Sequence, residues 1–396
     1  MTRAPRRGAL ILVLFHAVLI QIITFAMRPT LSYAVLDAGG SAASLGVIVA
    51  AFAVPALLLA LPVGRAIDRL GERPALLLGS LALIAATLIA ALAGQSFWVL
   101  LAATVLLGVG HLMSVIGEQA IVANTTSRGN FDSRFGYYAF AAALGQTVGP
   151  LLLALPGGSA STPPVGLIFI VCAGFSAVVL GVSLFVRSSP RQLVESHPSM
   201  LSTAGTLLRT PGLPRALLAS SIVLSSVDLF LAYIPALGQD RRLTAIVVSA
   251  MLVTRSMFSM VSRLFLGPMV RLLGRRVLMV WTIAASAVAL GCLAIPVPAI
   301  WLIALSAIYG FTIGTCQPIT MSWISELAQP GNRGVAMSLR LASNRMGQTL
   351  LPALLGSFAA ATGAAGVLVA VGVVLVGAAW SSAAVGNVSA ADDRPS

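Results

Sequence analysis

The chain has 396 residues, of which 58% are hydrophobic and only 9% are charged, and its mean hydropathy is +0.99. A water-soluble globule of this length cannot cover its surface with so few polar side chains, so the composition excludes a soluble protein and predicts a membrane protein. The net charge of +13 would suit a nucleic-acid binder, but all 24 basic residues are arginine, and their positions give them another role.

Long apolar runs follow one another along the chain, each closed by a short charged or turn-rich segment. About 20 apolar residues in a helix cross a hydrocarbon core, and the runs have about that length. The first run follows TRAPRR and has no small-residue cleavage site after it, so we expect a retained helix and not a signal peptide. We predict an all-α membrane protein with twelve transmembrane helices, at 9–27, 44–63, 74–93, 97–123, 136–156, 165–186, 214–237, 243–267, 276–295, 298–323, 334–360 and 364–385.

The arginines fall mainly on one side of the predicted membrane. With a cytoplasmic N-terminus, eighteen lie in cytoplasmic segments and three lie outside, namely Arg28, Arg241 and Arg242. Because such a bias marks the cytoplasmic surface, the arginines encode topology, and we expect no nucleic acid as a partner. Arg28, followed by Pro29, is expected to end the first helix at the outer face. Both termini should be cytoplasmic, in a protein of the inner or plasma membrane.

Two sequence motifs recur at a nearly constant offset. GRAIDRLGER at 64–73 is echoed by GPMVRLLGRR at 267–276, and GQTVGP at 145–150 by GQTLLP at 347–352, at offsets of 203 and 202 residues. Each copy occupies the matching place in its half. We therefore expect two six-helix pseudo-repeats, an N-terminal bundle at 1–186 and a C-terminal bundle with a short tail at 214–396, joined by a cytoplasmic linker at 187–213.

Twelve spans in two sets of six, a basic central loop and the loop pattern G-x-x-x-D-R-x-G-x-R at 64–73 resemble the major facilitator superfamily. The resemblance covers essentially the whole chain. It implies secondary active transport of a small solute, by rocking of two bundles around a site at the membrane midplane and without ATP hydrolysis. It also implies a protein that works as a monomer in the lipid bilayer. The helices at 9–27, 97–123, 214–237 and 298–323 would line the cavity.

The loop at 64–73 is the first candidate for gating. Its glycines allow a tight reversal at the membrane surface, and a carboxylate near a helix N-terminus is stabilised by the helix dipole. By resemblance, Asp68 would latch onto the start of the helix at 334–360, where Arg333 or Arg340 would pair with it; the alternative is a solvated loop that only sets topology. In the second copy Arg271 replaces the acid, with Asp132 as its expected partner. The gating residues of this region are Gly64, Asp68, Arg69, Gly71, Arg73 and Arg340.

Charged side chains inside the predicted helices are the second group of candidates, because each is costly in a bilayer and requires a partner, a cavity or a function. Asp228 and Glu118 are expected to carry coupled protons. The intramembrane arginines outnumber the acid of the second half, and guanidinium binds carboxylate or phosphate well, so we expect an anionic solute. The expected solute-binding residues are Arg255, Arg345, Asn344, Gln348 and His111.

Each of these candidates has a structural alternative. Asp228 and Arg255 would neutralise each other as a buried pair, which is the usual arrangement of buried charges. Glu118 would be a gate acid paired with a cytoplasmic arginine, and His111 and His16 would be packing histidines with hydrogen-bonded rings.

The motif GQTVGP points to export. Gly145, Gly149 and Pro150 resemble a helix signature of drug/proton antiporters, and we count them with the gating residues. Those antiporters carry an arginine in the helix at 97–123 where this chain has Thr104, so that arrangement is not reproduced.

The sequence thus predicts a proton-coupled exporter or exchanger of a small organic anion. The alternatives are a proton-coupled carboxylate importer, a sensor that no longer transports, and a lipid flippase. Cys172, Cys292 and Cys316 fall in apolar runs without metal-site spacing, and no enzyme motif is found, so we expect no metal, cofactor or catalysis.

Overall fold

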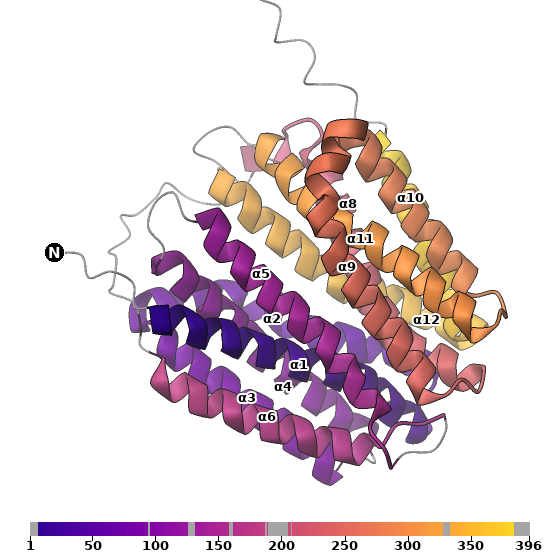
Figure 1. Ribbon diagram of the computed structural model, residues 1–396, viewed down its shortest axis with the longest axis horizontal. Coiled ribbons are helices and arrows are strands. Elements are labelled where there is room, and N and C mark those ends of the chain that lie inside the picture. Colours follow the sequence, from indigo (N-terminus) through magenta and orange to yellow (C-terminus); the bar gives the residue numbers. More distant parts are fainter. Residues whose placement is uncertain are drawn as a thin grey trace, which may run out of the picture.

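The computed structural model describes residues 7–93, 96–125, 131–157, 161–186, 188, 205–206, 208–327 and 333–383. Within these ranges the chain is helical apart from short turns (Figure 1). The elements are α1 (Arg7–Asp37), α2 (Ala42–Leu70), α3 (Glu72–Ala93), α4 (Phe97–Asn124), α5 (Phe131–Val148), the 3-10 helix η1 (Gly149–Ala154), α6 (Val165–Phe185), α8 (Leu213–Asp240), α9 (Ala245–Leu273), α10 (Arg275–Leu293), α11 (Ala299–Leu327) and α12 (Arg333–Ala383).

The long element α12 contains two of the predicted helices. Gly363 has φ 65° and ψ −169°, a conformation that interrupts the helix and that glycine adopts without steric cost. The predicted helices at 334–360 and 364–385 lie on either side of this kink. Eleven segments of the described residues are long and apolar enough to cross a membrane. The part of α12 before Gly363 is a further long helix, at the place predicted for the eleventh span. The predicted all-α fold of twelve transmembrane helices is confirmed.

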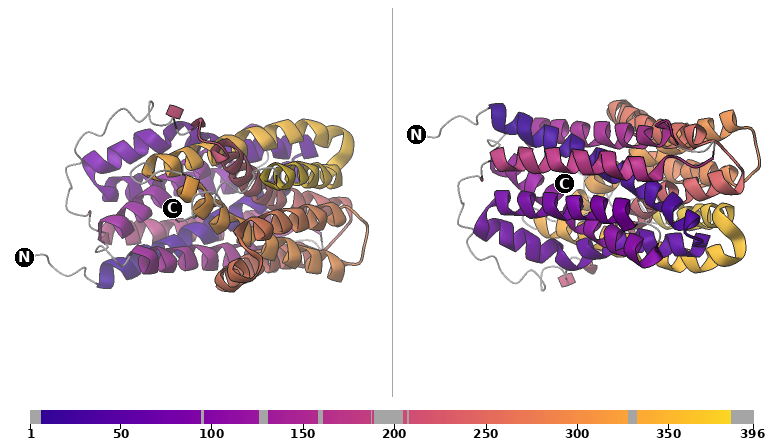
Figure 2. Two further views of the ribbon diagram at one scale, coloured as in Figure 1. Left: turned by 90° about the horizontal axis from the view of Figure 1, so that it is seen from above. Right: turned by 90° about the horizontal axis from the view of Figure 1, so that it is seen from below.

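The helices form two bundles that lie side by side (Figure 1). In the N-terminal half, α1 packs on α4, α5 and α6, while α3 packs on α4 and α6. In the C-terminal half, α8 packs on α12, α9 on α11, and α10 on both α11 and α12. The helices run roughly parallel to one another across the molecule (Figure 2). We call the face where α1 and α8 begin the terminal face, and the face where they end the opposite face.

Close contacts at glycines show that the two halves are built alike. A Cβ on Gly145 of α5 would stand 2.3 Å from the Val18 carbonyl oxygen of α1, and one on Gly347 of α12 would stand 1.9 Å from the Ser221 hydroxyl of α8. Likewise Gly108 of α4 fits against α2, and Gly310 of α11 fits against α9. The paired glycines are 202 residues apart, as the sequence repeat predicts.

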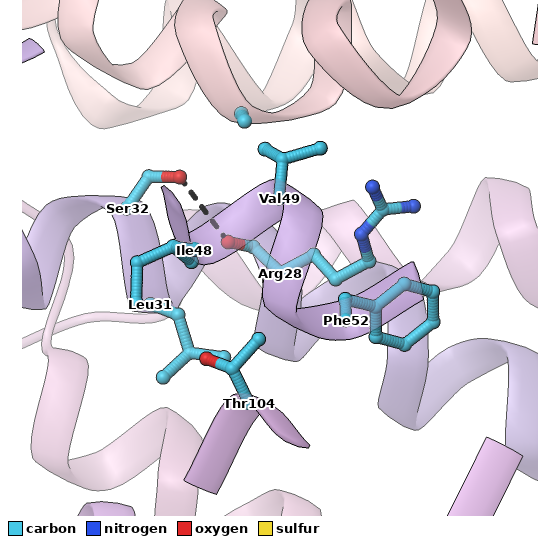
Figure 3. Close-up of a pocket in the computed structure, with 8 residues that line it drawn as sticks. Arg28, Leu31, Ser32, Ile48, Val49, Phe52 and Thr104 are labelled. Carbon is cyan, nitrogen blue, oxygen red and sulfur yellow. Dashed lines mark hydrogen bonds between the residues drawn. The ribbon is translucent and has the colours of Figure 1, made fainter. Parts of the chain in front are cut away.

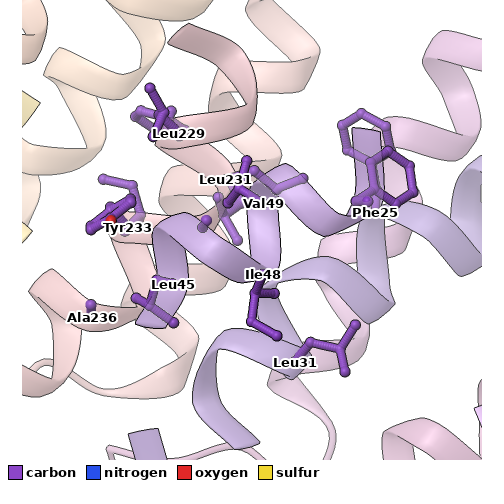
Figure 4. Packing of buried hydrophobic residues seen from close by; sticks show 14 of the residues in the cluster. Phe25, Leu31, Leu45, Ile48, Val49, Leu229, Leu231, Tyr233 and Ala236 are labelled. Carbon is purple, nitrogen blue, oxygen red and sulfur yellow. The ribbon is translucent and has the colours of Figure 1, made fainter. Parts of the chain in front are cut away.

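The two bundles meet where α2 packs on α12, where α1 and α2 pack on α8, and where α5 and η1 pack on α9. Figure 4 shows part of the apolar core at this interface, between α1, α2 and α8. Val49 of α2 lies beside Leu231 of α8, and Ile48 of α2 lies near Leu31 of α1, within one cluster of buried apolar residues. Hydrogen bonds join the halves near the opposite face, where Tyr233 donates to the Ala42 carbonyl at 2.9 Å. This face is therefore closed.

Candidate functional site

Arg28 lies inside α1 and not at its end. The helix runs on past Pro29 to Asp37, so the expectation that Arg28 and Pro29 end it at the outer face is wrong. The proline leaves the carbonyl of Phe25 without its helical donor. The helix continues because α1 packs on α4, α5, α6 and α8, and neighbouring helices help a membrane helix to tolerate proline. Arg28 is consequently held within the protein, with 8% of its surface exposed.

Arg28 pairs with an acid of the other half. Its Nη1 donates to Oδ1 of Asp228 in α8 at 2.7 Å, and its guanidinium also lies over the ring of Phe52, 4.6 Å from the centroid. Oδ2 of Asp228 accepts from Nε2 of Gln348 at 2.7 Å, and Oε1 of Gln348 accepts from Nη1 of Arg345 at 3.0 Å. One charged chain of hydrogen bonds thus joins α1, α8 and α12.

Arg255 is near this chain but bonds elsewhere. Its Nη2 donates to the Ser256 hydroxyl at 2.7 Å, and its guanidinium lies 6.0 Å from the ring centroid of Phe25. Among the described residues the salt bridge of Asp228 is made to Arg28. The prediction that Asp228 pairs with Arg255 is therefore wrong. Because α1 packs directly on α8, the carboxylate of Asp228 is bonded to Arg28 instead.

The site holds more positive charge than its acid can compensate. Arg28, Arg255 and Arg345 lie around Asp228, and we call these three arginines the arginine cluster. Within the described part of the chain, Nη2 of Arg28 and Nε of Arg255 are buried without a hydrogen-bond acceptor. A buried donor without an acceptor costs free energy, so such groups need a partner, which is either water or a bound solute.

Two other expected solute-binding residues lie in or beside this region. The Thr24 hydroxyl donates to the Ile20 carbonyl, so its oxygen accepts from Nδ1 of His111 at 3.1 Å. The His111 ring also packs against Phe52, with centroids 5.5 Å apart. With the proton on Nδ1, Nε2 is a hydrogen-bond acceptor. Asn344 is buried on the same helix as Arg345, and its Oδ1 has no donor among the described residues.

A small pocket opens beside Arg28 (Figure 3). Its walls come from α1, α2, α4 and α8, and in the view the Arg28 side chain runs toward Phe52 with Thr104 below. Thr104 stands where drug/proton antiporters carry an arginine, and here the guanidinium of the pocket comes from α1. The lining residues are Arg28, Leu31, Ser32, Ile48, Val49, Phe52, Thr104 and Ala232.

The segment predicted as a loop at 64–73 is mostly helical, because α2 continues to Leu70 and α3 begins at Glu72, with Gly71 between them. Its described bonds reach the end of α6 and Ser188, which follows α6. Gly71 has φ 89°, and a Cβ there would stand 2.6 Å from the Ser188 hydroxyl. That hydroxyl accepts from the backbone N–H of Arg73 at 3.1 Å, and Nη2 of Arg73 donates to the Leu184 carbonyl at 3.0 Å. Arg69 is exposed, and open space surrounds Gly64.

The partners needed for the expected latch fall partly outside the described residues. The side chains of Asp68, Asp132 and Arg333 are not described, so the latch and its counterpart at Arg271 stay predictions. Arg340 is buried in α12 and its Nε has no acceptor among the described atoms. Most of the predicted linker at 187–213 and the tail after residue 383 also lie outside the described residues.

Gly145, Gly149 and Pro150 pack the N-terminal half and touch the other one. Both glycines fit against the α1 backbone, where a Cβ on Gly149 would stand 2.7 Å from the Ile22 carbonyl oxygen. The carbonyl of Pro150 accepts from the Ser249 hydroxyl of α9 at 2.7 Å. Because Gly347 packs in the same way in the second half, this packing says nothing about the direction of transport.

Glu118 is separate from the arginine cluster and fully buried. It bonds to His16 of α1 and Tyr138 of α5 inside the N-terminal bundle. The expected pairing with a cytoplasmic arginine is not what the described residues show. The sequence analysis missed both Arg28 and this contact. A run with few charges that continues after Pro29 was the available signal for Arg28.

Comparisons with known proteins agree with this architecture. The chain matches the family described as the Major Facilitator Superfamily over residues 13–251 and 216–389, and so belongs to it. It is a multi-pass membrane protein with the fold of that family of transporters. A sequence search of curated proteins gives no significant match.

Solved structures with the same fold include several transporters. A variant of the nucleoside transporter NupG aligns with a TM-score of 0.79 at 15% identity, covering 95% of this chain and 99% of that one. A D-xylose-proton symporter aligns with a TM-score of 0.75 at 17% identity, covering 95% and 97%. A POT family transporter in complex with 5-aminolevulinic acid gives a TM-score of 0.75 at 14% identity, covering 94% and 95%. These likenesses concern the fold.

Proposed function

We propose that the protein is a proton-coupled secondary transporter of a small organic anion, which binds at the arginine cluster. The observation that carries this proposal is the excess of buried guanidinium groups over carboxylates there, with donors of Arg28 and Arg255 left without acceptors. A carboxylate or phosphate accepts two parallel hydrogen bonds from a guanidinium, which suits such donors. Arg345, Gln348, Asn344 and His111 supply further polar contacts.

The Arg28–Asp228 salt bridge supports coupling to protons. While Asp228 is ionised, it occupies Arg28 in place of a solute carboxylate. A proton on Asp228 weakens that bond and frees Arg28, so proton and anion bind together. A proton gradient directed into the cell would then drive uptake, which favours the carboxylate importer over the exporter predicted from GQTVGP.

Access to this site follows from the closed opposite face. Tyr233 to Ala42, Gln239 to Asp37 at 3.3 Å and Ser249 to Pro150 join the bundles there. If the terminal face is cytoplasmic, as the arginines predict, the structure is closed to the exterior. Breaking these bonds would open the site to the other side, as alternating access requires.

Uptake into proteoliposomes tests the proposal. Purified protein would be offered a panel of carboxylates, organic phosphates, neutral nucleosides and sugars, and organic cations, with and without an imposed pH gradient. We expect anions to accumulate when the gradient is directed inward. Arg28→Gln should abolish this uptake, and Asp228→Asn should leave uptake but remove its dependence on the gradient, since an amide carries no proton.

Arg242→Gln is the matched control, because that arginine is exposed at the opposite face and should leave uptake unchanged. Accumulation of neutral or cationic solutes alone would contradict an anion site. Efflux without uptake would favour the exporter that the sequence predicts. Movement of labelled lipid without any solute transport would favour the flippase, and no transport of any kind would favour the sensor.

A further inference from the structure

A second set of ionisable groups lies inside the N-terminal bundle, away from the arginine cluster. His16 precedes Arg28 by twelve residues in α1, about 18 Å along the helix axis at a rise of about 1.5 Å per residue. His16 and Glu118 both have 0% of their surface exposed. The apolar residues Val13, Ala17, Leu76, Ile121 and Val122 form the core around them.

The two side chains bond directly and each has a further partner. Nδ1 of His16 lies 2.5 Å from Oε1 of Glu118, and the Tyr138 hydroxyl of α5 donates to Oε2 at 2.9 Å. On the other side of the ring, Nε2 lies 3.0 Å from the Ser183 hydroxyl of α6. That hydroxyl also lies 3.0 Å from the hydroxyl of Ser80 in α3. The network therefore connects five helices of one bundle.

The Ser183 hydroxyl decides how hydrogens can be arranged in this network. Its single proton has three acceptors within reach, namely the Val179 carbonyl at 2.9 Å, the Ser80 hydroxyl at 3.0 Å and Nε2 of His16 at 3.0 Å. When that proton is donated to the Val179 carbonyl, Nε2 of His16 must carry a proton and donate to the Ser183 oxygen. A second proton lies between Nδ1 and Oε1, as imidazolium with carboxylate or as imidazole with carboxylic acid. In both forms the pair is neutral, which suits its complete burial.

Loss of one proton from the pair has a defined structural consequence. With neutral imidazole donating from Nδ1 to an ionised Glu118, Nε2 becomes an acceptor. The Ser183 hydroxyl must then turn from the Val179 carbonyl to Nε2. The Tyr138 hydroxyl stays bonded to the carboxylate and stabilises the negative charge that remains.

We propose that His16 and Glu118 form a proton-binding site that takes up and releases one proton as a unit. The change in charge reorients the Ser183 hydroxyl and so alters the bonding between α1 and α6. Because α1 also carries Arg28, the site acts on the helix that holds the arginine cluster. The inference concerns protons and does not depend on which solute is carried.

The other ionisable groups near the site leave the pair as its titrating unit. From α5, Tyr138 faces Glu118 directly, and Arg134 stands one turn before it. From α3, Glu72 lies two turns before Ser80 and accepts from Nδ2 of Asn124 at 2.9 Å. The described part of α6 contributes the Ser183 hydroxyl and no charged group. Glu118 lies six residues before the end of α4, which places the pair nearer the terminal face.

Infrared difference spectroscopy tests this site without any solute. Protein with ¹⁵N-labelled histidine would be reconstituted in lipid and titrated between about pH 4 and pH 10, which brackets histidine and carboxyl titration. We expect a one-proton transition whose bands include a labelled histidine. The whole transition should be lost in Glu118→Gln and equally in His16→Gln. Glu72→Gln is the matched control, a buried acid bonded to an amide, and should retain it.

Tyr138→Phe provides a test that keeps both members of the pair. Removing the hydroxyl leaves Oε2 of Glu118 without its donor, so the carboxyl bands of the transition should shift in frequency while the one-proton transition is kept. A transition that persists in Glu118→Gln, a loss of only part of the bands in each variant, or unchanged carboxyl bands in Tyr138→Phe would overturn the proposal.

Discussion

The buried ion pair of Arg28 and Asp228 bears on both the stability and the proposed function of the protein. Both side chains are nearly buried, with 8% and 5% of their surfaces exposed, and each gives up its hydration to reach the other. Such a pair contributes little net stability, but either member left alone is a strongly unfavourable buried charge. The same property makes the pair useful in a transporter, since a solute anion or a proton can replace one half of it.

A double-mutant cycle tests this interpretation at the level of two side chains. Arg28→Met and Asp228→Asn should each lower the free energy of unfolding by about 3 to 5 kcal/mol, because each leaves its partner uncompensated. The double variant should recover most of that loss. Thermal unfolding midpoints of the purified proteins provide the measurement, with Arg242→Met as an exposed control. Losses that simply add in the double variant would show that the two residues do not stabilise each other.

At the scale of helices, small residues set how closely neighbours approach. Gly145 places α5 against α1, and Gly347 places α12 against α8, with 202 residues between them. Inside a bilayer the hydrophobic effect does not drive helices together, so membrane helices rely on such close packing. The equal spacing of the paired glycines in the two halves therefore reflects a packing requirement that both halves share.

Alanine substitutions separate these packed glycines from unpacked ones. Gly145→Ala and Gly347→Ala should each destabilise the protein by about 1 to 3 kcal/mol, because the added methyl group overlaps the neighbouring helix. Gly174→Ala in α6 meets nothing within 4 Å and should be neutral or stabilising by up to about 1 kcal/mol. Thermal unfolding in one detergent compares the three. Equal effects at all three positions would contradict a packing role.

The helices themselves were predictable because hydropathy is a local property of the chain. The runs at 97–123 and 165–186 differ from α4 and α6 by one residue at an end. Side-chain partners were not predictable, since His16 and Glu118 are 102 residues apart and Arg28 and Asp228 are 200 apart. Pro29 also suggested a helix end, but α1 continues to Asp37 among the helices packed around it. Local sequence gives the elements, whereas long-range packing decides which polar groups meet.

At the scale of the whole molecule, the contacts between the halves define a state. The bonds made by Tyr233, Gln239 and Ser249 close the opposite face, and the Arg28–Asp228 pair lies between that closure and the terminal face. A transporter in this state admits solute from the terminal face. Which compartment that is depends on the orientation of the chain, and the arginine distribution predicts the cytoplasm.

Cysteine labelling in intact cells tests this orientation. Cys292 is partly exposed, whereas Cys172 and Cys316 are buried, so all three would first be replaced to remove background reaction. Ala38→Cys, in the exposed turn between α1 and α2, should react with a membrane-impermeant maleimide added outside the cells. Ser199→Cys, in the linker, should react only after the membrane is permeabilised. Arg242→Cys, in the turn between α8 and α9, should match Ala38→Cys. The reverse pattern would invert the topology and make the closed face cytoplasmic, so that solute would enter this state from outside.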